Sequence, residues 1–183
     1  MLVRDPKVFL MDEPIAHLDA KLRHRLRGEL KRIQEARGIT TLYTTTDYLE
    51  AFGMGDRIAI LHKGALQQLG SWEEIYNCPA NTFVATMVSD PPMNFFTCEA
   101  IDEGSKTILK TRCFSVEAGG RLLELVRKSN LRRFTLGIFP SKVTTIQGEA
   151  SEDLHSVPGF VELVEHRGAR KILLVGIDSE RFK

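Results

Sequence analysis

Two adjacent carboxylates are the side chains of this sequence best suited to do chemistry. Asp12 and Glu13 directly follow the apolar residues 8–11, a run typical of a short buried strand. Open α/β sheets bind their ligands at the carboxyl ends of their strands. At such a place one carboxylate can hold Mg²⁺ through its water shell, and a neighbouring one can orient or deprotonate an attacking water in phosphoryl transfer. The pair alone is equally compatible with a strand that ends in a turn at Pro14.

The residues around this pair predict alternating strands and helices in the first half of the chain. Leucine and isoleucine recur at helical spacing from Leu18 to Ile33, which indicates a helix after the first strand. Asp19 is placed to cap that helix and Gly38 to end it. The remaining expected elements are a strand over 39–45, a helix over 48–54, a hairpin of 57–61 with 65–69, and helices over 71–76 and 81–88.

The second half of the chain has a different pattern, and we expect it to form a separate domain. Asp90-Pro91-Pro92 cannot continue a helix, so the predicted domains are 1–90 and 91–183. Short β-favouring segments separated by glycines favour a small barrel or sandwich. The expected strands cover 95–101, 106–111, 133–139, 159–164 and 171–177, with one helix over 121–128.

Composition excludes several classes of protein. With 43% hydrophobic residues and a net charge of +1, the chain can form a core and is not wholly disordered. Cys78, Cys98 and Cys113 match no metal-binding spacing, and we interpret them as reduced thiols of a cytosolic protein. No apolar run approaches the ~20 residues of a spanning helix, and the first residues lack the features of a secretory signal.

The stretch VFLMDEPIAHLDAKLR closely resembles the Walker B segment and D-loop of ABC transporter ATPases, above all those that import sugars and related solutes. The resemblance continues to residue 95. The second half is similar, more weakly, to the appended OB-type (TOBE) barrel of that family, through LGIFP and GFVELVEHRGARKILLVGI. The resemblance implies an α/β fold, the C-terminal part of a P-loop NTPase ABC domain, followed by a mostly β OB-type barrel that is incomplete.

The resemblance also implies roles for four residues. Asp12 takes the position of the magnesium-binding aspartate and Glu13 that of the catalytic base, with ATP and Mg²⁺ as cofactors of the complete family member. Asp19 takes the position of the D-loop aspartate at the interface of two ATPase subunits. Thr46 stands where the family has its switch histidine, and a threonine hydroxyl has neither the charge nor the reach of imidazole.

Several family motifs do not occur in these 183 residues. The sequence contains no GxxxxGK[ST] phosphate loop, no Q-loop and no LSGGQ-type signature. Without the backbone amides and the lysine of a phosphate loop, a triphosphate has no cradle. The chain is therefore interpreted as a C-terminal fragment that begins just before Walker B, and we expect it alone to bind no cofactor and to be inactive.

The resemblance implies a second ATPase subunit and membrane permease subunits as partners, on the inner face of the cell membrane. Two alternatives remain open from the residues. One is a non-catalytic regulatory or assembly protein, with self-association through exposed sheet. The other is an OB-type nucleic-acid-binding module, suggested by seven Lys or Arg between residues 21 and 37; a solvated helix face explains these charges more simply, so no nucleic acid is expected.

Overall fold

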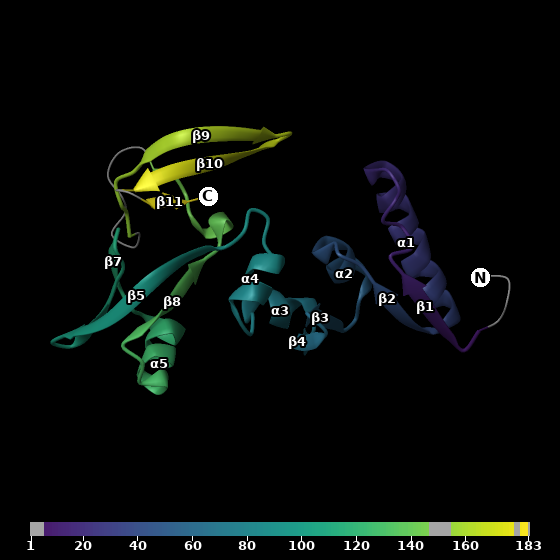
Figure 1. Cartoon of the computed structure of the whole chain (residues 1–183), viewed down its shortest axis with the longest axis horizontal. Helices are drawn as coiled ribbons and strands as arrows, with labels where there is room; N and C mark the ends of the chain where they lie inside the picture. Colours follow the sequence, from purple (N-terminus) through teal and green to yellow (C-terminus); the bar gives the residue numbers. More distant parts are fainter. Residues whose placement is uncertain (1–5, 147–154, 178–179, 183) are drawn as a thin grey trace. The chain divides into compact units, whose positions relative to one another are not determined.

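The computed structural model describes residues 6–146, 155–177 and 180–182. It divides into two compact units, Met1–Val88 and Ser89–Lys183 (Figure 1). Helices and strands alternate in the first unit, whereas antiparallel strands dominate the second. The mixed α/β character expected from the sequence is therefore confirmed.

The first unit begins with a parallel pair of strands joined by a long helix. β1 (Val8–Asp12) pairs with β2 (Thr40–Thr44), in a register that runs from Val8↔Thr40 to Asp12↔Thr44. The connecting helix α1 (Ala20–Arg37) starts where Asp19 accepts a hydrogen bond from the Leu22 amide at 3.0 Å. It ends at Gly38, whose φ of 60° is left-handed, a conformation that glycine adopts without steric cost. The predicted strand, cap, helix and stop are all confirmed.

In the rest of the first unit, a two-stranded sheet and three short helices pack around an aliphatic core. Its elements are α2 (Tyr48–Met54), β3 (Ile58–His62), β4 (Ala65–Gly70), α3 (Trp72–Asn77) and α4 (Thr82–Met87). The hairpin turns at Lys63 and Gly64, which both have positive φ, as a two-residue primed turn requires. The buried core residues are Ile58, Ile60, Ile75, Val84 and Val88. These elements agree with the sequence prediction to within about two residues at their ends.

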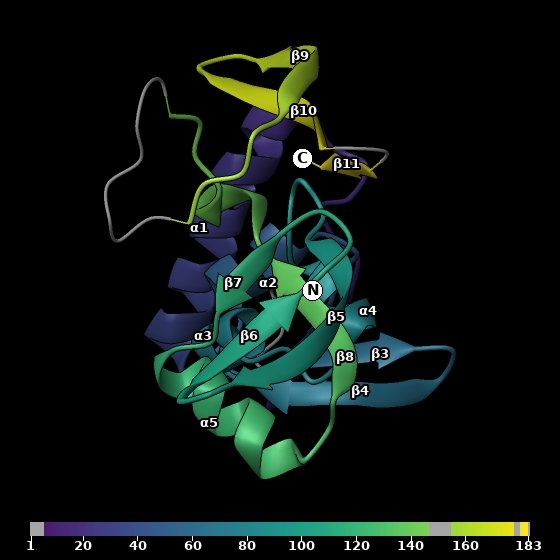
Figure 2. The same ribbon diagram turned by 90° about the vertical axis from the view of Figure 1, so that its left-hand side faces the viewer.

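The second unit contains an antiparallel four-stranded sheet covered by one helix. The strands β5 (Asn94–Glu103), β6 (Lys106–Lys110), β7 (Ser115–Glu117) and β8 (Arg133–Ile138) lie in the order β7-β6-β5-β8. Leu122, Leu123 and Val126 of α5 (Gly120–Ser129) pack on the core formed by Cys98, Ala100, Leu109 and Ala118. Figure 2 shows α5 beside this sheet.

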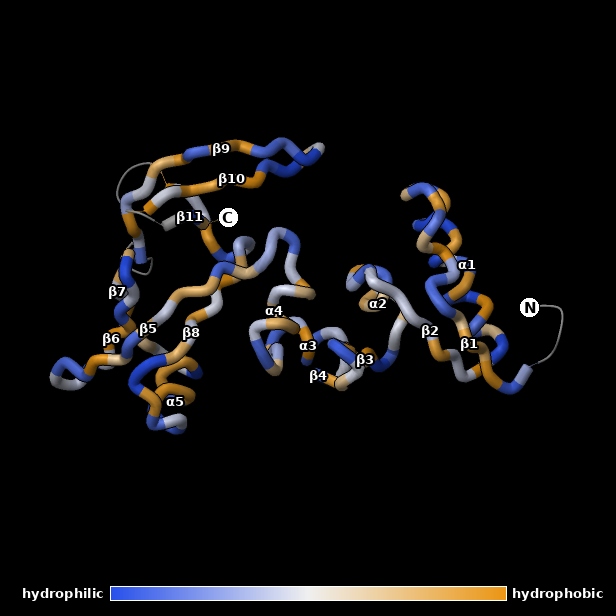
Figure 3. The backbone as a smooth tube through the Cα atoms, in the orientation of Figure 1, coloured by the Kyte–Doolittle hydropathy of each residue, from blue (hydrophilic) through white to orange (hydrophobic). Residues whose placement is uncertain are grey.

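A second sheet follows a short 3₁₀ turn at Pro140–Lys142. It contains β9 (Phe160–Arg167), β10 (Arg170–Ile177) and β11 (Glu180–Phe182), in the order β11-β10-β9. Figure 3 shows hydrophobic residues along β9 and β10 and hydrophilic ones at the tip of their hairpin. Across the described ranges these two sheets form no closed barrel, so the OB-type barrel is not confirmed. Short strands and glycine turns are common to open sheets and barrels, and they do not determine closure.

Candidate functional site

Asp12 and Glu13 lie at the carboxyl end of β1, where β2 also ends. Since the two strands are parallel, the register places Thr44 opposite Asp12. The Thr44 hydroxyl donates to Asp12 Oδ1 at 2.5 Å. The Glu13 amide donates to the Thr44 carbonyl oxygen at 3.1 Å and approaches Thr44 Oγ1 at 3.3 Å. Both carboxylates are exposed, so they are available to a ligand at this edge of the sheet.

The backbone at Glu13 has an unusual conformation. Its φ is 41°, in the left-handed region that costs a residue with a Cβ roughly 1–2 kcal/mol. The Glu13 carbonyl accepts a hydrogen bond from the Ala16 amide at 3.2 Å, which closes a turn. Ile15, 3% exposed, anchors that turn in the interior. The chain therefore turns away from the strand immediately after the pair. Non-glycine residues with left-handed backbone conformations are often found at functional sites.

Arg23 of α1 fixes the loop that leads from Glu13 to Asp19. Its guanidinium donates to the carbonyl oxygens of Ala16 and Leu18, both at 3.1 Å. Another nitrogen of the same group lies 3.9 Å from a carboxylate oxygen of Asp47. Within the described residues, its buried Nε has no hydrogen-bond partner. Arg23 thus joins the loop before α1 to the start of α2, a link that the sequence did not reveal.

Thr46 lies in the short segment between β2 and α2, two residues beyond Thr44, and it is exposed. The neighbouring residues hold this segment. Asp47 caps α2 by accepting from the amides of Leu49 at 2.9 Å and Glu50 at 3.3 Å, and its own amide donates to the Thr45 hydroxyl at 3.1 Å. The position predicted for the switch residue therefore follows the same sheet edge as Asp12 and Glu13.

A hydrogen bond between the buried Glu50 and the half-buried Tyr43 supports α2 from the β2 side. Glu50 is 2% exposed, and it accepts a short hydrogen bond from the Tyr43 hydroxyl. Burial, and then the hydrogen bond to Glu50, raise the pKa of Tyr43 well above its ordinary value, since both disfavour the phenolate. A glutamate in a short helix usually predicts a solvated side chain, so no sequence pattern indicated this pair.

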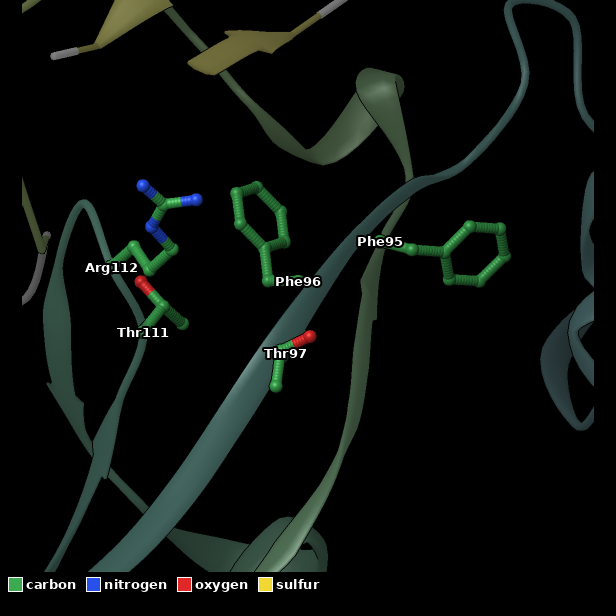
Figure 4. Close-up of a pocket in the computed structure, with 5 residues that line it drawn as sticks. All are labelled: Phe95, Phe96, Thr97, Thr111 and Arg112. Carbon is green, nitrogen blue, oxygen red and sulfur yellow. The ribbon is translucent and has the colours of Figure 1, made fainter. Parts of the chain in front are cut away.

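Two hollows accompany these elements. A groove of about 1020 Å³ in the first unit is lined by α1, β2, α2 and β3, and it includes Thr44 and Thr46 but not the two carboxylates. A smaller pocket of about 200 Å³ lies in the second unit, beside Phe95, Phe96, Thr97, Thr111 and Arg112 (Figure 4). Phe96 also packs against Phe114 and stacks on Phe182, so aromatic packing accounts for that region.

The oxygen atoms at the sheet edge fit magnesium better than a transition metal. Among the described residues, no group of three or more His, Cys, Asp or Glu side chains is arranged to hold an ion. Magnesium needs no such protein cage, because it retains waters and binds through one or two carboxylates together with substrate phosphates. Asp12 fits that mode of binding.

Comparison with known proteins identifies the class of proteins to which the chain is similar. No family model matches the chain. It is 41% identical over 194 aligned residues to a trehalose/maltose import ATP-binding protein of Thermococcus litoralis, which covers 99% of this chain and 49% of the relative. It is 38% identical over 182 residues to an sn-glycerol-3-phosphate import ATP-binding protein of Ruegeria sp. (98% and 47%). A trehalose import ATP-binding protein of Mycobacterium tuberculosis is 52% identical over 95 residues (52% and 24%).

The proteins to which the chain is similar are thus import ATP-binding proteins. More particularly, the chain is homologous over nearly its whole length to the trehalose/maltose and the sn-glycerol-3-phosphate import ATP-binding proteins, in agreement with its resemblance to ABC importer ATPases. It spans about half the length of the first two relatives. These relatives do not favour the nucleic-acid-binding or assembly alternatives. Across the described ranges, no helix combines the length and the apolar character that a membrane crossing needs.

Proposed function

We propose that the chain supplies the magnesium- and water-handling part of the ATP site of an ABC importer subunit for sugars or related solutes. Asp12 holds Mg²⁺ through its waters, and Glu13 orients or deprotonates the water that attacks the γ-phosphate. Thr46 occupies the switch position, and Asp19 faces a second ATPase subunit. The observation that carries this proposal is the Asp12–Glu13 pair at the carboxyl end of a parallel strand, where both residues are hydrogen-bonded to Thr44.

The chemistry of the site supports these roles. Mg²⁺ neutralises negative charge that develops on the transferred phosphoryl group. The chain's own contribution is the orientation of Asp12 and the placement of Glu13 one residue further, beside the same Thr44. A general base of this kind typically contributes 10²–10⁴-fold to the rate.

The remaining parts of the proposal concern assembly. In the complete subunit, ATP-driven closure of two ATPase subunits would act on membrane permeases, with the chain at the inner face of the membrane. The second unit would contribute to an OB-type regulatory domain. This assignment of the second unit is supported by the antiparallel character of both of its sheets and by the relatives that cover 98–99% of the chain.

The proposal can be tested by joining the chain to the preceding part of the Thermococcus litoralis relative and measuring ATP hydrolysis. Glu13→Gln in that fusion removes the base while keeping a side chain of the same shape, and we expect kcat to fall by about 10²-fold or more. Glu35→Gln is the matched control, because Glu35 is an exposed glutamate of α1 whose carboxylate lies 3.8 Å from Lys31. Equal rates for Glu13→Gln and the unchanged fusion would contradict the role of Glu13.

A further inference from the structure

One hydroxyl group contacts both members of the carboxylate pair. Thr44 Oγ1 donates to Asp12 Oδ1 at 2.5 Å and accepts from the Glu13 amide at 3.3 Å. A threonine hydroxyl has one donor and two acceptor lone pairs, so it can make both hydrogen bonds at once. The carbonyl of the same residue accepts from the Glu13 amide at 3.1 Å. Thr44 is therefore joined to the pair through its side chain and its backbone.

This contact limits the freedom of an otherwise exposed carboxylate. The terminal torsion of an aspartate is broad, and Asp12 is exposed at the strand end. A donor fixed on the neighbouring strand engages Oδ1 and leaves Oδ2 for other partners. Donors that orient a metal-binding carboxylate typically change metal affinity or activity by 10–100-fold when they are removed.

The same contact supports Glu13, whose φ of 41° is unfavourable for a glutamate. Both hydrogen bonds of its amide go to Thr44. Because the parallel register places Thr44 opposite Asp12, this support comes from the strand pairing and not from the loop that follows.

We infer that Thr44 is a positioning residue for the Asp12–Glu13 pair: its hydroxyl orients the Asp12 carboxylate and stabilises the left-handed backbone of Glu13. The catalytic meaning of this inference rests on the proposed function. The positioning itself does not, because it is a statement about contacts between three residues of the chain.

The test uses the 183-residue chain and three variants. Thr44→Val removes the hydroxyl and keeps the branched shape that suits a strand, whereas Thr44→Ser keeps the hydroxyl. Thr40→Val makes the same change on the same face of β2, at the opposite end of the register. NMR spectroscopy would follow the side-chain carboxyl carbon of Asp12 and the amide of Glu13.

We expect Thr44→Val to move both signals, while Thr44→Ser and Thr40→Val leave them close to those of the unchanged chain. The inference is overturned if the signals keep their places in Thr44→Val, or if Thr44→Ser moves them as far as Thr44→Val does. This comparison involves no nucleotide and no activity, so it decides the positioning role whether or not the proposed function holds.

Titration with Mn²⁺ alone tests the link to metal binding. In the unchanged chain, we expect paramagnetic broadening to begin at Asp12 and its neighbours. Thr44→Val should require about tenfold more Mn²⁺ for the same broadening, and Thr44→Ser should restore the original response. Equal Mn²⁺ response in Thr44→Val and the unchanged chain would contradict an effect of Thr44 on the metal. Absence of broadening near Asp12 in every variant would instead contradict the proposed metal role of Asp12.

Discussion

At the scale of single residues, the chain combines a proposed catalytic pair with a threonine, Thr46, at the position of the family's switch histidine. Asp12 and Glu13 are exposed and share contacts with Thr44, while Thr46 takes the position where the resemblance implies a histidine. A hydroxyl can donate one hydrogen bond, but it cannot place positive charge near a phosphate. We therefore expect a substitution in the pair to lower the rate of ATP hydrolysis and a histidine at the switch position to raise it.

Thr46→His should increase the rate of ATP hydrolysis in the fusion described above. Imidazole restores a longer donor that can carry charge, and a group of this kind at a phosphoryl-transfer site is worth on the order of 10²-fold. The measurement is kcat for released phosphate. Thr40→His, at the far end of β2, is the control. A rate no higher than that of the unchanged fusion would argue against Thr46 as the switch position.

Tyr43 makes a separate prediction about pH. Its pKa is raised in the folded chain by burial and by Glu50, so its contribution to stability is complete below the unfolded value of about 10 and is lost as the pH rises toward the folded value. Phenolate absorbance of the chain minus that of Tyr43→Phe should show a midpoint above 10. A midpoint at or below 10 would show that Tyr43 is not buried against Glu50.

At the scale of elements, helix caps hold the site segments in place. Asp19 starts α1 just after the loop that follows Glu13, and Asp47 starts α2 one residue after Thr46. Arg23 contacts the carbonyls of the first segment and lies near the carboxylate of the second. The two loops that leave the sheet edge are thus connected through side chains of the helices that follow them.

Asp47→Ala should destabilise the chain through α2. Its carboxylate accepts from two helix amides, and the loss of such a cap typically costs about 1 kcal/mol. Urea unfolding would measure the change in free energy. Asp56→Ala is a suitable control. The Asp56 side chain is 84% exposed, and its partner among the described residues is Lys31 at 3.0 Å, a surface pair worth at most about 1 kcal/mol and commonly less. Equal losses in both variants would contradict the capping role.

The limits of sequence reasoning can be seen in these same elements. Asp19, Gly38 and the Lys63-Gly64 turn could be predicted because each acts through its immediate neighbours. The contact of Thr44 with Asp12 joins residues 32 positions apart and depends on strand register, which no local pattern specifies. The burial of Glu50 likewise depends on tertiary packing, including its hydrogen bond with Tyr43 of β2. β7 and β11, with three residues each, are too short for a periodic pattern.

At the scale of the whole molecule, the chain aligns with about half of each of its first two relatives. Its 183 residues contain no phosphate-loop motif, and the backbone amides of such a loop bind the phosphates of a nucleotide. Leu10 and Leu42 of the paired strands β1 and β2 are 66% and 63% exposed. Exposed apolar residues on neighbouring strands are a feature of surfaces that pair with other protein segments.

Calorimetric titration of the chain with Mg-ATP should show no micromolar binding. The reason is that Asp12 and Glu13 are proposed to bind only the metal and the attacking water. In these roles they make no contact with the adenosine or with most of the phosphate oxygens. The fusion with the Thermococcus litoralis segment is the positive control, and micromolar binding is expected there. Micromolar binding by the chain alone would contradict the prediction.

The left-handed backbone at Glu13 has an evolutionary consequence. Glycine would adopt a φ of 41° without the steric cost that a Cβ imposes, so Glu13→Gly relieves strain while deleting the proposed base. A library selected only for heat resistance should therefore enrich glycine at position 13, whereas one selected for nutrient uptake should retain glutamate. On the proposed function, stability and activity therefore favour different residues at position 13.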